Sequence, residues 1–180
     1  MDIRRMLSWL SRRSANRQLI DRLHGEIMAA ARNPVLFTDY AIEDTFEGRF
    51  EAMTLHAMLV LRQLNAMAPP APELAQDLAD AVFARLEEAL REMGVGDVSV
   101  PKRMKILAEA FLGRSLAYDQ ALRLGEPALA AALARNVYAG RADARRLASY
   151  VEAANIALAK ASFAVFADGP VPFPEPAAIH

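Results

Sequence analysis

The chain of 180 residues has no cysteine, almost no excess of charge and no long apolar run. Without cysteine, disulfide bonds, thiolate catalysis and zinc–sulfur sites are excluded, and a reducing compartment is allowed. The net charge of −1 argues against DNA or general nucleic-acid binding, because such proteins carry a large positive excess. A membrane-spanning helix needs about 20 consecutive apolar residues, and no segment of the chain is that apolar.

Segments rich in Val, Ile and Thr with a period of two are also missing, which argues against a sheet. The chain is rich instead in Ala, Leu, Arg, Glu and Met, all strong helix formers. It is 54% hydrophobic and 24% charged, which is enough apolar material for a core, and its length suits one domain. The sequence therefore predicts an all-α, single-domain bundle of six to seven helices.

Composition divides the chain into a basic amphipathic arm (residues 1–17), a helical domain (residues 18–166) and a proline-rich tail (residues 167–180). In the arm, the apolar residues fall on one arc of a helix and most of the cations fall on the opposite arc. Three interpretations stay open: a plain first helix, a membrane-surface anchor, and an organelle-targeting segment. The candidate membrane-surface residues are Arg4, Arg5, Trp9, Arg12 and Arg13.

Apolar residues at helical spacing predict six helices in the domain. They cover approximately residues 18–31, 45–64, 72–93, 101–124, 128–138 and 142–164. The helix over 101–124 carries two apolar faces, which predicts a central position with neighbours on both sides. The tail has prolines at 170, 172, 174 and 176, and we expect it to be extended or loose.

The segment between the first two of these helices, residues 35–42, is apolar but has no helical stripe. Asn33-Pro34 ends the preceding helix, because a residue before proline avoids the α region. Such an apolar connection either packs into the core or contacts a partner. Under the second interpretation, Phe37 and Tyr40 are candidate partner contacts.

The segment GVGDVSVP separates two long helices. Gly94 suits the position after a helix, where φ is positive, and Ser99 and Pro101 suit the start of the next helix. Three cations follow: Lys102, Arg103 and Lys105. The helix dipole disfavours cations there. Either they are a solvated helix end, or they form, with Arg114, an exposed patch that contacts a partner.

Catalytic and metal-binding patterns are weak. Asp21 and His24 share a helix face, but a metal centre in a bundle needs several such ligands that converge. His56, at the edge of an apolar stripe, is better explained as a hydrogen-bonded core histidine than as a base. Ser99 and Lys102 match the S-x-x-K string of penicillin-recognising enzymes, but its companions S-D-N and K-T-G are absent. We therefore expect no catalytic residue, no metal and no cofactor.

Three stretches resemble one family: residues 44–64 (DTFEGRFEAMTLHAMLVLRQL), 90–122 (LREMGVGDVSVPKRMKILAEAFLGRSLAYDQAL) and 129–138 (LAAALARNVY). In order and spacing, from about residue 20 to residue 160, they are similar to the ubiquinol–cytochrome c chaperone family of α-proteobacteria and mitochondria. The shared residues are Asp44, Thr45, Phe46, Leu55, His56, Tyr118, Asp119, Ala132, Leu133, Arg135 and Asn136.

The resemblance implies assembly work: a chaperone that binds newly made cytochrome b and assists maturation of the cytochrome bc1 complex. It also implies partners, namely nascent cytochrome b and, by analogy with mitochondrial members, the ribosome or a small partner subunit. Because the chain starts almost at the domain, we expect a bacterial cytoplasmic protein, with peripheral contact to the inner face of the membrane. The candidate partner-binding residues are Phe37, Tyr40, Arg49, His56, Lys102, Arg103, Lys105, Arg114, Tyr118, Asp119, Arg135 and Asn136.

The alternative function is a small helical enzyme that acts on a lipid or haem-related ligand. A buried pocket lined by Arg49, His56 and Tyr118 would support the enzyme. An apolar groove without convergent polar groups would support the chaperone.

Overall fold

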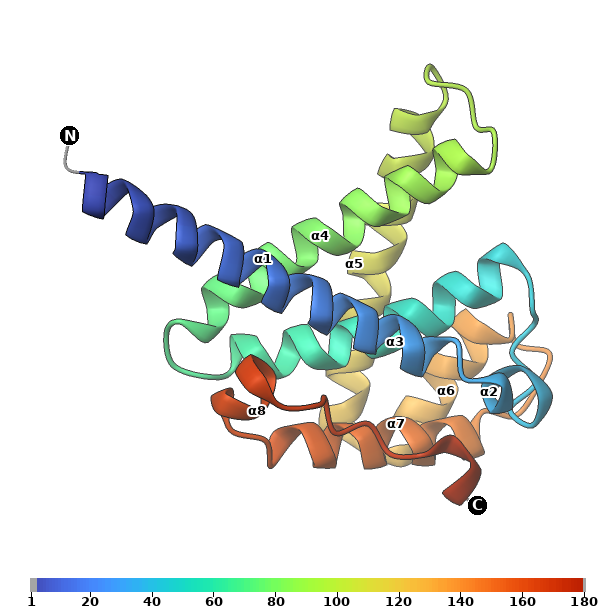
Figure 1. The fold of residues 1–180 in the computed structure, drawn as a ribbon. Helices are drawn as coiled ribbons and strands as arrows, with labels where there is room; N and C mark the ends of the chain where they lie inside the picture. Colours follow the sequence, from blue (N-terminus) through green and yellow to red (C-terminus); the bar gives the residue numbers. More distant parts are fainter. Residues whose placement is uncertain (1–2, 180) are drawn as a thin grey trace.

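The computed structural model describes the backbone of residues 3–179 and the side chains from residue 16 onward. Six long helices form most of this part of the chain (Figure 1). They are α1 (Ile3–Ala31), α3 (Phe46–Asn65), α4 (Ala71–Glu92), α5 (Val100–Leu124), α6 (Glu126–Val137) and α7 (Arg145–Ala159). Two short helices, α2 (Pro34–Thr38) and α8 (Phe163–Asp168), and a 3-10 turn, η1 (Pro176–Ala178), complete it. Residues 3–179 contain no strand, and the prediction of an all-α domain is confirmed.

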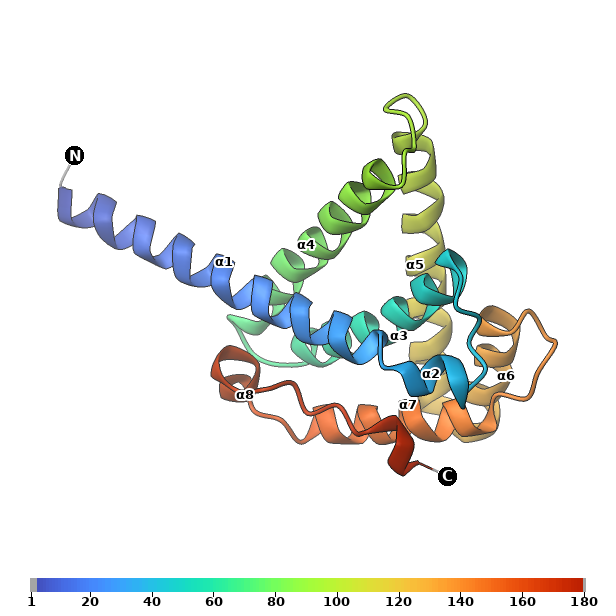
Figure 2. The ribbon, with the colours of Figure 1, turned by 45° about the vertical axis from the view of Figure 1, so that its right-hand side comes forward.

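The central helix is α3. It contacts α1, α4, α5, α6 and α7, and Figures 1 and 2 show it crossing the middle of the bundle. From Phe50 to Val60 every residue of α3 is buried, as expected for a helix that is apolar on all sides. The prediction that α5 holds the central place was wrong, because Ile106, Leu112 and Leu116 on α5 are more than half exposed.

The first helix runs without interruption across residues 17 and 18, so the basic arm and the domain share one helix. The side chains of Arg4, Arg5, Trp9, Arg12 and Arg13 lie outside the described side chains. No helix of the described residues is long and apolar enough to cross a membrane.

The apolar segment after α1 packs into the core. Its first residues form α2, and Leu36, Tyr40 and Ile42 are each at most 4% exposed. Of the two interpretations of this segment, packing into the core is therefore the one that describes its position. Phe37 is half-buried against the same core.

Between α4 and α5, the end of α4 agrees with the prediction, whereas the start of α5 differs from it. Gly94 has φ +81°, and the Gly94 and Val95 amides donate to Arg91 O and Leu90 O, which is the Schellman pattern. The C-terminal prediction at Gly94 is confirmed. The side chain of Ser99 makes no capping hydrogen bond, so its predicted role was wrong and Pro101 in the first turn remains the local signal for the helix start.

The last predicted helix is interrupted. It divides into α7 and α8 around Lys160–Ser162, and the proline-rich tail then returns across the bundle from α8 toward α2 (Figure 1).

Candidate functional site

His56 joins two helices inside the core. Its Nδ1 lies 2.7 Å from Ala52 O, and its Nε2 lies 2.8 Å from the hydroxyl of Tyr150 on α7. Burial lowers the pKa of His56 to about 4, so the ring is neutral at pH 7. In that state Nδ1–H donates to Ala52 O and Nε2 accepts from Tyr150. This residue is only 1% exposed and acts as a core histidine.

Arg114 and Glu51 form a buried ion pair between α5 and α3. Arg114 Nε lies 2.6 and 2.7 Å from the two carboxylate oxygens of Glu51, and Glu51 is 5% exposed. Burial raises the pKa of Glu51 although the arginine opposes this shift. Tyr118, fully buried beside this pair, also has a raised pKa, through burial first and the charge of Glu51 second. Arg114 is thus bound in the core and does not belong to an exposed patch with Lys102.

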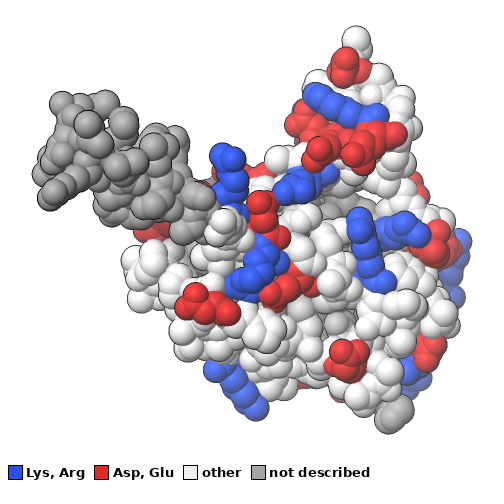
Figure 3. Space-filling model, viewed as in Figure 1, with Lys and Arg blue, Asp and Glu red and all other residues white. Residues whose placement is uncertain are grey.

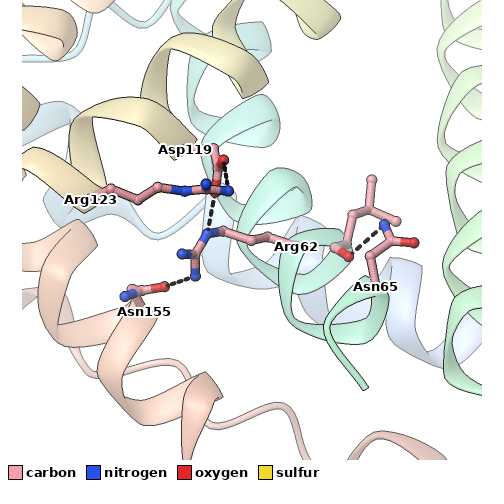
Figure 4. A network of polar contacts seen from close by, with 6 residues as sticks. Arg62, Asn65, Asp119, Arg123 and Asn155 are labelled. Atoms are coloured by element: carbon pink, nitrogen blue, oxygen red, sulfur yellow. Dashed lines mark hydrogen bonds and ion pairs between the residues drawn. The ribbon is translucent and has the colours of Figure 1, made fainter. Parts of the chain in front are cut away.

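A polar network ties three helices together at one end of α3 (Figure 4). Arg62 of α3 donates to Asp119 Oδ1 on α5 at 2.7 Å and to Asn155 Oδ1 on α7 at 2.8 Å. Arg123 donates to Asp119 Oδ2 at 2.7 Å. The hydrogen bond from Arg62 is the main reason that the pKa of Asp119 is lowered. Asp119 was a candidate from the sequence, whereas Arg62 and Asn155 were not. Arg62 is 57 residues from Asp119 and 93 from Asn155, and such separations leave no local pattern.

Other motif residues also have structural roles. Thr45 caps α3 by accepting from the Gly48 amide at 3.2 Å. A Cβ on Gly48 would lie 1.9 Å from Glu43 O, so this position excludes every other residue. Asn136 donates to Ala132 O within α6, whereas Arg135 is exposed.

The three side chains proposed to line an enzyme pocket lie in different surroundings. Arg49 is 62% exposed in its side chain and pairs with Asp44 at 2.6 Å, and it lines a shallow pocket with Phe37. His56 and Tyr118 are buried. Within the described residues, no group of three or more His, Asp or Glu side chains is placed to hold a metal ion.

A groove of about 680 Å³ opens between α3, α4 and α5. Phe83 and Phe111 meet edge to face at 5.3 Å and join its two walls. Leu112 and Leu116 on the α5 wall are 60% and 63% exposed. The apolar lining consists of Met58, Leu61, Ala66, Ala79, Phe83, Phe111, Leu112 and Leu116.

The rim of this groove is polar and carries both charges. Arg62, Asp119 and Arg123 lie on one side, and Gln76 and Asp80 lie on the α4 side. This rim surrounds apolar side chains with groups that already pair with one another, such as Gln76 with Asp80 at 2.9 Å. Such a site suits binding of an apolar segment better than acid–base chemistry.

Leu112 and Leu116 were missed as site residues, although a signal was present. They are four residues apart on α5 and lie on a different face of the helix from Phe111 and Tyr118, which are buried. Large apolar residues left over at helical spacing indicate a face that is covered by something other than the core.

Comparison with known proteins agrees with the resemblance found in the sequence. The family model described as "Ubiquinol-cytochrome C chaperone" matches residues 38–173, a range that contains all three motif stretches. The crystal structure of the Cbp3 homolog from Brucella abortus matches with a TM-score of 0.86 and 36% sequence identity, over 97% of this chain and 99% of that chain. The comparison with curated proteins gave no match. The extent of these two matches shows that the chain belongs to the ubiquinol–cytochrome c chaperone family.

Proposed function

We propose that this protein is a non-catalytic assembly chaperone that binds newly made cytochrome b and assists maturation of the cytochrome bc1 complex. Family membership supports the chaperone role, and the groove between α3, α4 and α5 supports binding of an apolar client. The observation that carries the proposal is the exposure of Leu112 and Leu116 on its wall. Two large side chains kept in water at one groove indicate a surface that a partner covers.

The groove fits one apolar helix of the client. Leu112 and Leu116, one turn apart, form the ridge that a second helix receives between its own side chains. The paired charges at the rim stay in water and set the orientation of the bound helix. Covering both leucines stabilises the complex by about 2 kcal/mol, because each is already partly buried and a full burial contributes about 1.5 to 3 kcal/mol.

Changing both Leu112 and Leu116 to Ser tests this proposal. The double variant is expected to recover about 30-fold less newly made cytochrome b in a pull-down, which corresponds to about 2 kcal/mol. The melting temperature should stay nearly unchanged, since these side chains contribute little to the core. Ile106→Ser combined with Leu124→Ser is the matched control, since both residues are on α5, are 56% and 77% exposed and lie outside the groove lining. Equal recovery by the two double variants would refute the groove as the client site.

We also propose that the basic arm holds the chaperone at anionic membranes, near a client that inserts there. Each arginine near such a surface contributes about 1 kcal/mol. Changing Arg4 and Arg5 to Gln is therefore expected to weaken co-sedimentation with phosphatidylglycerol-containing liposomes about 30-fold. Arg141→Gln with Arg145→Gln removes the same charge from exposed positions elsewhere. The anchor proposal fails if that control weakens binding as much, or if the intact protein does not sediment with liposomes.

Lys102, Arg103 and Lys105 are exposed at the start of α5, and we propose that they contact an acidic partner such as the ribosome or a small partner subunit. Lys105 lies 3.9 Å from Glu109, the expected pair one turn along the helix. Figure 3 shows side chains of both charges at this end of the α4–α5 hairpin. The acceptor surface must therefore match a mixed pattern of charge.

A further inference from the structure

The proline-rich tail packs on a surface of the bundle, here called the trough, to which Arg22, Glu26, Tyr40, His56 and Arg146 contribute contacts. From α8 it runs beside α7 and ends near α2 (Figures 1 and 2). It contacts α3 where Phe173 meets His56. Its prolines at 170, 172, 174 and 176 remove every second amide donor, so the segment cannot pair as a strand or continue a helix. Its backbone–backbone hydrogen bonds in the described residues are local, for example Phe173 N to Val171 O at 2.8 Å.

Side chains of α1, of α7 and of the loop after α2 hold this tail by its backbone. Arg22 of α1 donates to Gly169 O at 2.5 Å, and Glu26 accepts from the Val171 amide at 2.5 Å. Further along, the Tyr40 hydroxyl donates to Pro176 O at 2.8 Å, and Arg146 Nε donates to Ile179 O at 3.2 Å. These contacts recognise an extended backbone with few amide donors, and they do not depend on the side chains of the tail.

The side chains of the tail pack on a layer of rings, here called the aromatic floor, formed by His56, Tyr150 and Tyr40. Phe173 packs edge to face on His56, with ring centroids 5.1 Å apart. His56 lies against Tyr150, and Tyr150 against Tyr40. Val171 and Pro176 are buried. Aromatic grooves of this kind bind extended proline-containing segments, whose low conformational entropy reduces the cost of binding.

We propose that this trough is a second peptide-binding site, for an extended, proline-containing apolar segment of another polypeptide, and that the tail is its resident ligand in cis. The inference rests on the proposed chaperone function, in which unfolded parts of a client need a protected apolar surface. Backbone-directed contacts let any such segment with apolar residues at the places of Val171, Phe173 and Pro176 replace the tail. The tail covers the aromatic floor when no client is present.

The test uses the full-length chain and a fluorescent peptide of sequence GPVPFPEPAAIH, which repeats residues 169–180. In the unchanged protein the attached tail competes with the peptide. The apparent affinity of the peptide is therefore lowered in proportion to the small fraction of molecules whose trough is free. Phe173→Ser loosens the attached tail, and peptide binding measured by anisotropy is expected to become at least ten-fold tighter. Ala177→Ser, at an exposed tail position, should bind as the unchanged protein does. The same peptide with Ser in place of Phe should fail to bind any of them.

Competition separates general recognition from recognition of this tail alone. An unlabelled extended peptide of different sequence that keeps Val, Phe and Pro at the matching places should displace the probe, and one with Ser at those places should not. If Phe173→Ser does not fold, Val171→Ser is the second variant that loosens the tail, since the Val171 side chain is buried. The proposal is wrong if a folded loosened variant binds the probe no better than the unchanged protein, or if only the tail's own sequence competes. The assay contains no cytochrome b, so its result is independent of the test of the α3–α4–α5 groove.

Discussion

Replacing Arg114 with Ala is expected to lower the free energy of unfolding by about 3 to 5 kcal/mol at pH 7, because it leaves the buried carboxylate of Glu51 without its partner. The two residues are joined at 2.6 and 2.7 Å, and Glu51 is only 5% exposed. Chemical denaturation followed by circular dichroism measures the change. Arg123→Ala is the control, since its side chain is 71% exposed and such surface pairs contribute about 1 kcal/mol or less.

The loss in Arg114→Ala should depend on pH in a defined direction. Burial already raises the pKa of Glu51 in the folded protein, and removing the arginine raises it further. A carboxyl group whose folded-state pKa is raised favours folding below its unfolded pKa and loses that contribution as the pH rises. The stability lost in Arg114→Ala should therefore become smaller as the pH falls toward about 4.5. Adding Glu51→Gln to Arg114→Ala should remove this dependence on pH. A pH-independent deficit would show that Arg114 acts through packing on Phe50, 5.8 Å from its guanidinium, and not through charge.

Acid is expected to destabilise the protein through His56, by roughly 3 kcal/mol between pH 6.5 and pH 4. The unfolded histidine takes a proton near pH 6.5, whereas the folded one resists it until about pH 4. The unfolded state therefore binds more protons in this window, and the free energy of unfolding falls as the pH falls. His56→Phe should lack this slope, although it is less stable at pH 7 because the Tyr150 hydroxyl loses its partner at 2.8 Å.

His24 provides the control for this acid effect. Burial lowers its pKa as well, but it lies half-buried between α1 and α4. His24→Gln should keep most of the slope of the unchanged protein. If His56→Phe retains the full slope between pH 6.5 and 4, the buried imidazole is not its source.

The motif residues that identify the family are mainly residues that hold the fold. Thr45 caps α3, His56 links α3 to α7, and Asp119 accepts from Arg62. The side chains proposed to contact the client, Leu112 and Leu116, lie within a motif stretch but outside the residues that mark the resemblance. Family membership was therefore visible in the sequence, whereas the groove proposed as the client site could be found only from the arrangement of α3, α4 and α5.

The amino-acid sequence by itself determined the helical class, the approximate limits of the long helices and the family, because each depends on neighbours in the chain. Gly94 ends α4 through its own positive φ, and Asn33-Pro34 separates α1 from α2, whatever lies around them. Only the tertiary structure decided that α3 is central and α5 lies at the surface, since the two apolar faces of α5 had predicted a central position for that helix instead. It also decided that the tail is held, because Arg22 and Gly169 are 147 residues apart. Contacts over such separations arise from the packing of whole helices, and no spacing of residues along the chain records them.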